Sequence, residues 1–189
     1  MRRYFDSIRH DILKAQLCRI IKDCRCLSLL FTVIDGYSVG GDAGGDASDG
    51  RKGLPIGNLT SQFFANLYLS PLDHYILEQL HPSGYVRYMD DMLLFADSRE
   101  AAGKLFCAVE SFCSERLGLH LREPVLGRCA DGVPFLGWRI SPGGVRVLSR
   151  SRRRMRATLR ALGRDVEAGR LSEQEAASRA DCMAACRRL

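Results

Sequence analysis

The sequence lacks several features that mark whole classes of protein. It has no run of about 18 apolar residues, the length that a membrane-spanning helix needs, and no signal-type apolar stretch before Asp6. It has no internal repeat, and its eight cysteines show neither paired zinc spacing nor the pattern of a disulfide framework. These absences argue against membrane, repeat and disulfide-rich secreted proteins, and we expect a soluble protein of the cytoplasm with reduced thiols.

The composition is that of an ordinary globular protein. Of the 189 residues, 46% are hydrophobic and 26% are charged, which is enough for a compact core but short for a complete multi-part nucleic-acid enzyme. Lys and Arg outnumber Asp and Glu by 28 to 22, and the excess gathers towards the C-terminus. This cluster predicts a polyanionic partner, although any one of its arginines is also typical of a solvated helix face. Its members are Arg150, Arg152, Arg153, Arg154, Arg156 and Arg160.

The first half of the chain alternates between helical and strand patterns. Apolar residues recur at helical spacing over 8–23 and again over 60–80. Residues 26–34 are β-prone and predict a strand, and the segment 35–53, rich in Gly, Asp and Ser, predicts a loop. Residues 85–95 predict two short strands joined by a tight turn.

The second half adds one helix, one strand and a helical pair. Helices alternating with an antiparallel hairpin indicate an α+β fold, with helices packed on one face of an antiparallel sheet and a small helical appendage after it. The expected elements are a helix over 98–117 that Ser98 caps and Gly118 stops, a strand over 133–140, a turn at 142–144, and helices over 149–168 and 172–188 separated at Gly169 and Arg170.

Two adjacent carboxylates, Asp90 and Asp91, lie between apolar strand residues at the turn of the expected hairpin. Ionised carboxylates in a partly desolvated turn repel each other unless a cation neutralises them. Hard divalent ions such as Mg²⁺ take oxygen ligands, and a pair of them can activate a hydroxyl and stabilise leaving pyrophosphate. The two residues therefore predict a magnesium site for polymerase chemistry, although an Asp-Asp pair alone is also an ordinary turn former.

Four segments resemble motifs of bacterial reverse transcriptases. YVRYMDDMLLF at 85–95 resembles the catalytic hairpin, and GLPIGNLTSQ at 53–62 resembles the segment before it. RYFDSIRH at 3–10 resembles the first palm motif, and FLGW at 135–138 resembles the primer grip. The form of residues 56–62, which ends in Ser-Gln, is most similar to the enzymes of diversity-generating retroelements, with group II intron and retron enzymes as close alternatives.

This resemblance implies an RNA-directed DNA polymerase, with a palm at residues 1–147 and a partial helical thumb at residues 148–189. It implies that Asp90 and Asp91 are catalytic and bind two Mg²⁺ ions, for which Mn²⁺ can substitute. The implied partners are an RNA template, a DNA primer and product, a deoxynucleoside triphosphate, and an accessory protein of the kind that retroelement enzymes often need.

The resemblance also gives roles to individual residues. Phe5 matches the aromatic side chain that stacks under the incoming sugar and leaves no room for a ribose hydroxyl, although it is also typical of a core phenylalanine. Ile56 stands where many retroviral relatives have a Gln, so base selection is expected to be relaxed. The implied nucleotide-binding residues are Phe5, Pro55, Ile56, Gly57, Ser61, Gln62, Tyr88 and Met89, the implied primer grip is Phe135, Leu136, Gly137 and Trp138, and the six arginines would follow the phosphates of an RNA–DNA hybrid.

The chain departs from the family pattern at its start. The first palm motif begins with a metal-binding Asp directly before the residue that corresponds to Met1, and this Asp and the fingers before it are not in the sequence. Asp6 is not expected to replace it, because strand alternation would aim its side chain differently. We therefore expect a truncated chain with little or no activity on its own.

Two other hypotheses stay open. A non-catalytic nucleic-acid-binding relic of a polymerase would keep the basic thumb and bind a hybrid in a salt-sensitive way that magnesium does not affect. A nucleotide cyclase or phosphohydrolase on a similar palm-like sheet is the third hypothesis, since a fold alone does not fix a function, and segment 56–62 argues against it.

Overall fold

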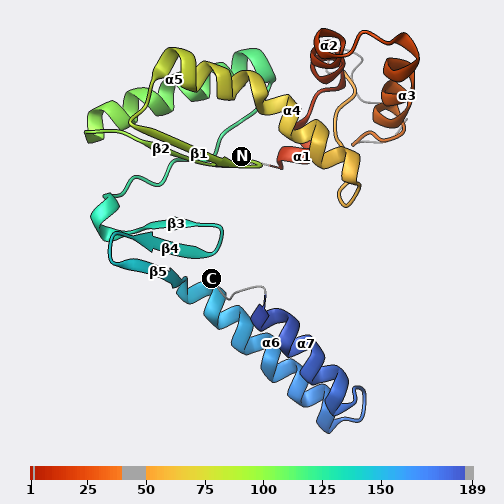
Figure 1. The fold of residues 1–189 in the computed structure, drawn as a ribbon, viewed down its shortest axis with the longest axis vertical. Helices are drawn as coiled ribbons and strands as arrows, with labels where there is room; N and C mark the ends of the chain where they lie inside the picture. Colours follow the sequence, from red (N-terminus) through yellow and green to blue (C-terminus); the bar gives the residue numbers. More distant parts are fainter. Residues whose placement is uncertain (2, 40–49, 186–189) are drawn as a thin grey trace. The chain divides into compact units, whose positions relative to one another are not determined.

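The computed structural model describes residues 1, 3–39 and 50–185, and these fall into two compact units, Met1–Leu126 and Gly127–Leu189 (Figure 1). Both units combine helices with a small antiparallel sheet, so the α+β prediction is confirmed at the level of composition. None of the helices in the described part of the chain is long and apolar enough to cross a bilayer.

The described residues of the first unit form five α-helices and one β-hairpin. In Figure 1, α5 runs along one side of the hairpin, and residues of α5 contact β2. The helices are α1 (Tyr4–Ser7), α2 (His10–Ile20), α3 (Cys24–Asp35), α4 (Leu59–Tyr75), which continues as a π-helical turn (Ile76–Leu80), and α5 (Arg99–Leu117), and the strands are β1 (Gly84–Tyr88) and β2 (Asp91–Phe95).

The prediction of a strand over 26–34 was wrong, because this segment is helix α3. The side chain of Asp23 caps the helix and accepts hydrogen bonds from the backbone N–H groups of Arg25 (2.7 Å) and Cys26 (2.9 Å). Ile34 is fully buried on one face of the helix. The helix cap and the burial of an apolar helix face therefore outweigh the β-propensity of these residues. The predicted loop lies mostly at 40–49, outside the described residues.

The predicted helices over 8–23, 60–80 and 98–117 are confirmed, with boundaries that differ by a few residues. The Asn58 side chain caps α4 by accepting a hydrogen bond from Thr60 N (3.2 Å). Ser98 caps α5 by accepting one from Ala101 N (3.0 Å), as the sequence predicts. Gly118 ends α5 in the left-handed conformation, with φ of 61°, which is the usual way for a glycine to stop a helix.

The core of the first unit lies between α2, α4 and α5. Tyr68 connects these three elements, because its buried hydroxyl donates to the carbonyl of Leu117 (2.6 Å) and accepts from the N–H of Arg9 (3.4 Å). Burial raises the pKa of Tyr68 to about 12. The largest fully buried side chains are Tyr68, Phe64, Ile8, Leu13, Leu17, Ile34, Leu54, Leu69, Leu72, Ile76, Leu117 and Leu119.

The second unit is a three-stranded antiparallel sheet followed by a helical pair. Its strands, in the order β3-β4-β5, are β3 (Val133–Phe135), β4 (Trp138–Ser141) and β5 (Gly144–Val147), and its helices are α6 (Ser149–Glu167) and α7 (Glu173–Ala185). The single strand predicted over 133–140 was wrong, since Leu136 and Gly137 reverse the chain between β3 and β4. The two predicted helices are confirmed and lie side by side (Figure 1).

Candidate metal and nucleic-acid site

The adjacent carboxylates Asp90 and Asp91 of the first unit lie at a two-residue hairpin turn. Tyr88 pairs with Asp91, so Met89 and Asp90 are the central residues of the turn. Met89 has φ of 53°, and Asp90 is not among the residues with positive φ, which is the pattern of a type II′ turn. Glycine is the usual residue at the first central position of such a turn, so Met89 holds a conformation that costs a bulky residue free energy.

The carboxylates of the turn are open to solvent. The side chain of Asp90 is 37% exposed, and its Oδ2 lies 3.7 Å from the backbone nitrogen of Met1. The same nitrogen donates a hydrogen bond to the backbone carbonyl of Asp90 (3.5 Å). Asp91 is exposed at the start of β2. The N-terminal end of the first motif therefore lies beside the acidic turn.

Arg87 ties the turn to helix α4. Its Nε donates to Oδ1 of Asp73 (2.7 Å), its Nη2 donates to Oδ2 of the same carboxylate, and its Nη1 donates to Oδ1 of Asn66 (3.0 Å) and to the carbonyl of Met89 (3.1 Å). The hydrogen bond with Asp73 raises the pKa of the Arg87 guanidinium above its usual value. Tyr85 donates to the same carboxylate (2.7 Å). Sequence reasoning missed this cluster, because the ion-pair partner lies on another element.

The first motif and the segment before α4 are joined through their backbones. Leu54 N donates to the carbonyl of Phe5 (2.9 Å), Gly53 N donates to the carbonyl of Ile8 (2.8 Å), and Nε2 of the buried His10 side chain lies 2.8 Å from the carbonyl of Gly53. Gly53 has φ of 105°, and a Cβ there would lie 2.5 Å from Cγ2 of Val39. A glycine is therefore required where the segment approaches the first motif.

Phe5 lies on the short helix α1 and is half-buried. Its ring meets the ring of Tyr4 edge to face, with centroids 5.7 Å apart, and it packs against the core. Tyr4 donates a hydrogen bond to the carbonyl of Ala65 on α4, which brings the first motif and α4 together. Because residues 4–7 are helical, strand alternation does not apply to Asp6, and that argument from the sequence was wrong.

The other predicted nucleotide-binding residues differ in exposure. Ile56 is 82% exposed, and Gln62 is exposed as well, whereas Ser61 is buried in the first turn of α4. Gly57 has φ of 96° and open space where a Cβ would stand, so its backbone needs a glycine although its surroundings do not. Pro55 is half-buried.

In the second unit, the predicted primer-grip residues form one tight hairpin. Phe135 pairs with Trp138, and the turn residues Leu136 and Gly137 have φ of 49° and 88°. Positive φ at both central positions is the pattern of a type I′ turn, in which Gly137 suits the second position and Leu136 is unusual at the first. Phe135 and Trp138 are half-buried and Leu136 is exposed.

The structure separates the six arginines of α6 into two groups. All six are exposed, and none forms an ion pair within residues 1, 3–39 and 50–185. Four of them line a shallow basin with Ser149 and Ala157, whereas Arg150 and Arg154 do not contribute to it. The four arginines of this basic basin are Arg152, Arg153, Arg156 and Arg160.

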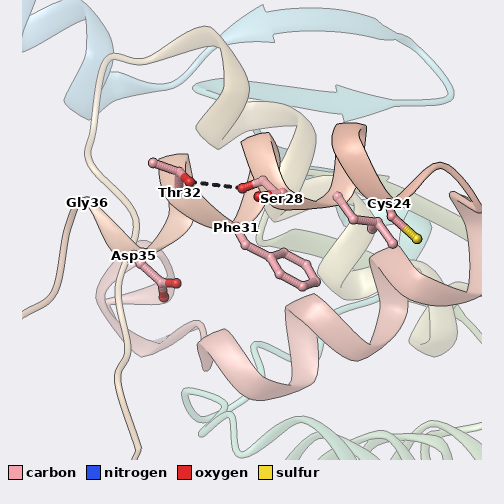
Figure 2. Close-up of a pocket in the computed structure, with 7 residues that line it drawn as sticks. Cys24, Ser28, Phe31, Thr32, Asp35 and Gly36 are labelled. Carbon is pink, nitrogen blue, oxygen red and sulfur yellow. Dashed lines mark hydrogen bonds between the residues drawn. The ribbon is translucent and has the colours of Figure 1, made fainter.

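A second concave surface lies along α3 (Figure 2). Its side chains include Phe31, and Asp35 closes one end. The Asp35 carboxylate is already engaged, because Lys14 Nζ lies 2.7 and 2.6 Å from its two oxygens. This surface therefore offers no unpaired charge to a ligand.

The acidic turn offers hard oxygen donors to a metal. No group of three or more His, Cys, Asp or Glu side chains able to hold a metal occurs in the described part of the chain. Asp73 is held by a bidentate pair with Arg87, so the donors at the turn are Asp91 and Asp90, whose Oδ2 lies 3.7 Å from the terminal ammonium of Met1. Mg²⁺ is commonly held by one or two carboxylates, with water and substrate phosphates completing its shell, so these two residues fit that ion.

Comparison with known proteins agrees with the motifs. The chain is 25% identical to Protein YkfC of Escherichia coli (strain K12) over 174 residues, which cover 72% of this chain and 44% of YkfC, so the chain spans less than half the length of that relative. The family model described as Reverse transcriptase (RNA-dependent DNA polymerase) matches residues 1–140. The chain therefore belongs to the reverse transcriptase family of RNA-dependent DNA polymerases.

Proposed function

We propose that this chain contributes the palm and the beginning of the thumb to an RNA-directed DNA polymerase, with Asp90 and Asp91 as its metal-binding catalytic residues. The observation that carries the proposal is the acidic turn, where two exposed carboxylates stand on a turn that Arg87 ties to α4. The ions would be two Mg²⁺, with Mn²⁺ as a substitute, and the substrates would be a deoxynucleoside triphosphate and a DNA primer on an RNA template.

The residues of the first unit would bind and orient the nucleotide. Leu54 N is hydrogen-bonded to Phe5 O, so the aromatic ring and the Pro55–Gly57 segment belong to one locally ordered surface. On this surface, Phe5 would contact the sugar, and the exposed Ile56 and Gln62 would face the base or template. The buried Ser61 would act through the backbone at the start of α4.

When bound, the metal ions would supply a more nucleophilic primer hydroxyl and neutralise the charge of the leaving pyrophosphate. Asp90 and Asp91 would hold them at the turn, and Tyr88 and Met89 would border the primer end. The side chains of the first motif and of segment 53–62 would exclude water from the reacting phosphate. This arrangement assigns positioning and charge neutralisation to the protein, which is what in-line nucleotidyl transfer requires.

The second unit would bind nucleic acid. The basic basin presents four guanidinium groups that have no acidic partner among the described residues, and Phe135, Leu136, Gly137 and Trp138 would support the primer as a grip. Proteins hold A-form-like hybrids chiefly through phosphate contacts and shape, which suits a row of arginines. Replacing Arg152 and Arg156 with Gln should weaken binding of an RNA–DNA hybrid more than replacing Arg150 and Arg154, a pair with the same spacing outside the basin.

Hybrid binding with and without Mg²⁺ tests the proposal, by fluorescence anisotropy at fixed ionic strength. We expect Mg²⁺ to strengthen binding of a hybrid together with a deoxynucleoside triphosphate, and expect this gain to vanish in Asp90→Asn. Salt-sensitive binding with no gain from Mg²⁺ would instead favour the second candidate, a non-catalytic nucleic-acid-binding relic. That candidate draws support from the exposed arginines of α6 and from the presence of only two carboxylates at the turn.

Primer extension addresses activity itself. We propose that this chain alone extends a DNA primer on an RNA template weakly or not at all, because the turn supplies two carboxylates and no third ligand occurs in the described part of the chain. Robust Mg²⁺-dependent synthesis by the 189-residue chain would contradict that expectation. We further propose a cytoplasmic enzyme of the diversity-generating retroelement type, on the form of residues 56–62, with group II intron and retron types as alternatives.

A further inference from the structure

We propose that Arg87 is a positioning residue that fixes the peptide between Met89 and Asp90, and with it the direction in which the Asp90 carboxylate points. This inference rests on the proposed metal-binding role of Asp90 and Asp91. Arg87 itself would touch neither metal nor substrate, because its guanidinium is directed to α4 and to a backbone carbonyl.

The guanidinium of Arg87 donates hydrogen bonds to three different residues at once. Its Nε and Nη2 grip both oxygens of Asp73, and the two N–H bonds of Nη1 are divided between Asn66 and the carbonyl of Met89. The side chain of Arg87 is 13% exposed and that of Asp73 is 24% exposed, so these contacts are largely shielded from water. Such a planar, bidentate pair has a defined orientation, which a lysine ammonium lacks.

The carbonyl that Arg87 holds is the one that decides the turn type. Type I′ and type II′ turns differ mainly by a flip of the peptide between the two central residues. In this turn that peptide joins Met89 to Asp90, and the positive φ is confined to Met89. The hydrogen bond from Nη1 to Met89 O therefore selects the II′ form, and a flip would turn Asp90 and its carboxylate away from their present direction.

The support for Arg87 comes from outside the turn. Asp73 and Asn66 lie on α4, and Tyr85 on β1 adds a hydrogen bond to Oδ1 of Asp73. Burial and that hydrogen bond raise the pKa of Tyr85 well above its usual value, so this hydroxyl stays a donor at neutral pH. The strained Met89 conformation is thus maintained by contacts that run from α4, the helix after segment 53–62, through Arg87 to the carbonyl of Met89.

The test uses the whole chain with Arg87→Lys, Asn66→Ala and a matched control, Arg170→Lys, which alters a solvent-exposed arginine paired with Asp165. The first readout is the ¹⁵N–¹H signal and relaxation dispersion of the Asp90 amide, which belongs to the peptide in question. The second is Mn²⁺ affinity, followed by the electron paramagnetic resonance of free Mn²⁺. Urea unfolding midpoints show whether each variant remains folded.

We expect Arg87→Lys to shift and broaden the Asp90 amide and to weaken Mn²⁺ binding about tenfold, as removal of outer-shell partners of a metal site commonly does. Asn66→Ala, at an exposed residue, should give a smaller change of the same kind, and Arg170→Lys none. If Arg87→Lys does not fold, the Asp90 amide signal and the Mn²⁺ affinity of Asn66→Ala test the proposal instead. An unchanged signal of the Asp90 amide in the folded variants would overturn the proposal. Unchanged Mn²⁺ binding in Asp90→Asn would refute the metal site, and the role of Arg87 would then be decided by the Asp90 amide signal alone.

Discussion

Among the described residues, two tight hairpin turns have positive φ at a central position, one in each unit, and they keep their shape by different means. Leu136 and Gly137 form a type I′ turn whose second residue is a glycine, so only Leu136 holds a side chain at positive φ there. Met89 and Asp90 form a type II′ turn without glycine, and Arg87 holds it from the side through contacts to α4. The first turn has a glycine at one of its two positive-φ positions, whereas the acidic turn has none and is held by contacts to α4.

This difference has a physical reason. A glycine at position 89 would relax the acidic turn and also give its backbone more freedom in the unfolded and folded states. A side chain at that position restricts the backbone, and a hydrogen-bonded guanidinium restricts the peptide further. Locally unfavourable backbone that is held by its surroundings is common at functional sites, and the proposed metal ligands Asp90 and Asp91 stand on it.

The largest effect is expected from Asp73→Leu. This change leaves the largely buried Arg87 guanidinium without its bidentate partner, and loss of one member of such a pair should cost about 2–3 kcal/mol. Urea unfolding monitored by the tyrosine signal would measure it. Asp165→Leu, which removes a carboxylate from an exposed pair with Arg170, should cost less than about 1 kcal/mol. Equal losses in the two variants would contradict the special role of the α4 contact.

Alkaline pH should weaken the unit with the acidic turn and spare the other. Burial raises the pKa of Tyr68 to about 12, and burial with the Asp73 hydrogen bond raises that of Tyr85 above its usual value. Because the folded pKa exceeds the unfolded one, this stabilisation is complete below about pH 10 and is lost as the pH rises towards the folded pKa.

The two units can be followed separately in this experiment. All six tyrosines lie in Met1–Leu126, and the single tryptophan, Trp138, lies in Gly127–Leu189. Above about pH 10, the urea midpoint seen by tyrosine absorption should fall faster than the midpoint seen by Trp138 fluorescence. Parallel losses in both signals would show that the raised pKa values do not govern alkaline stability.

Gly137→Val should destabilise the second unit by about 1–2 kcal/mol, because valine is costly at positive φ. The φ of Gly137 is 88°, and a Cβ there would meet Oγ of Ser151 at 3.3 Å. Gly143→Val is the matched control, since Gly143 has no positive φ and open space around a Cβ. Trp138 fluorescence during urea unfolding reports both changes. A Gly137→Val variant as stable as the control would mean that the turn can change its conformation freely.

Met89→Gly should have the smallest effect on stability, within about 0.5 kcal/mol of the unchanged chain. Relief of the positive-φ strain and the greater entropy of glycine in the unfolded state are of similar size and oppose each other. Differential scanning calorimetry would test this, with Met92→Gly as the control inside strand β2. A large loss in Met89→Gly would mean that the methionine side chain, rather than Arg87, holds the acidic turn.

Much of the fold followed from local signals. Ser98 and Gly118 marked the ends of α5, and the apolar strand residues on both sides of Asp90 and Asp91 marked the hairpin, because these signals come from neighbouring residues. Residues 26–34 were misread as a strand, since the Asp23 cap was overlooked. The Leu136–Gly137 turn was likewise missed, because Leu-Gly is not one of the residue pairs that usually mark a type I′ turn.

The candidate site was predicted in its residues but not in its supports. Phe5, segment 53–62 and the acidic turn came from motifs, whereas the pairing of Arg87 with Asp73 joins positions that no local pattern connects. The division of the α6 arginines followed only from the helix geometry, which sets Arg150 and Arg154 outside the basic basin. Contacts between elements distant in sequence are what the sequence alone leaves undetermined.

Mn²⁺ binding by the turn carboxylates is the most direct measurement of the proposed site. The variants are Asp90→Asn and Asp91→Asn, and the control is Asp97→Asn, an exposed carboxylate that follows the same hairpin and accepts a hydrogen bond from Ser83 (2.8 Å). We expect Asp90→Asn and Asp91→Asn each to weaken Mn²⁺ binding at least about tenfold, with Asp97→Asn unchanged. Equal Mn²⁺ affinity in all three variants and the unchanged chain would contradict a metal site at the acidic turn.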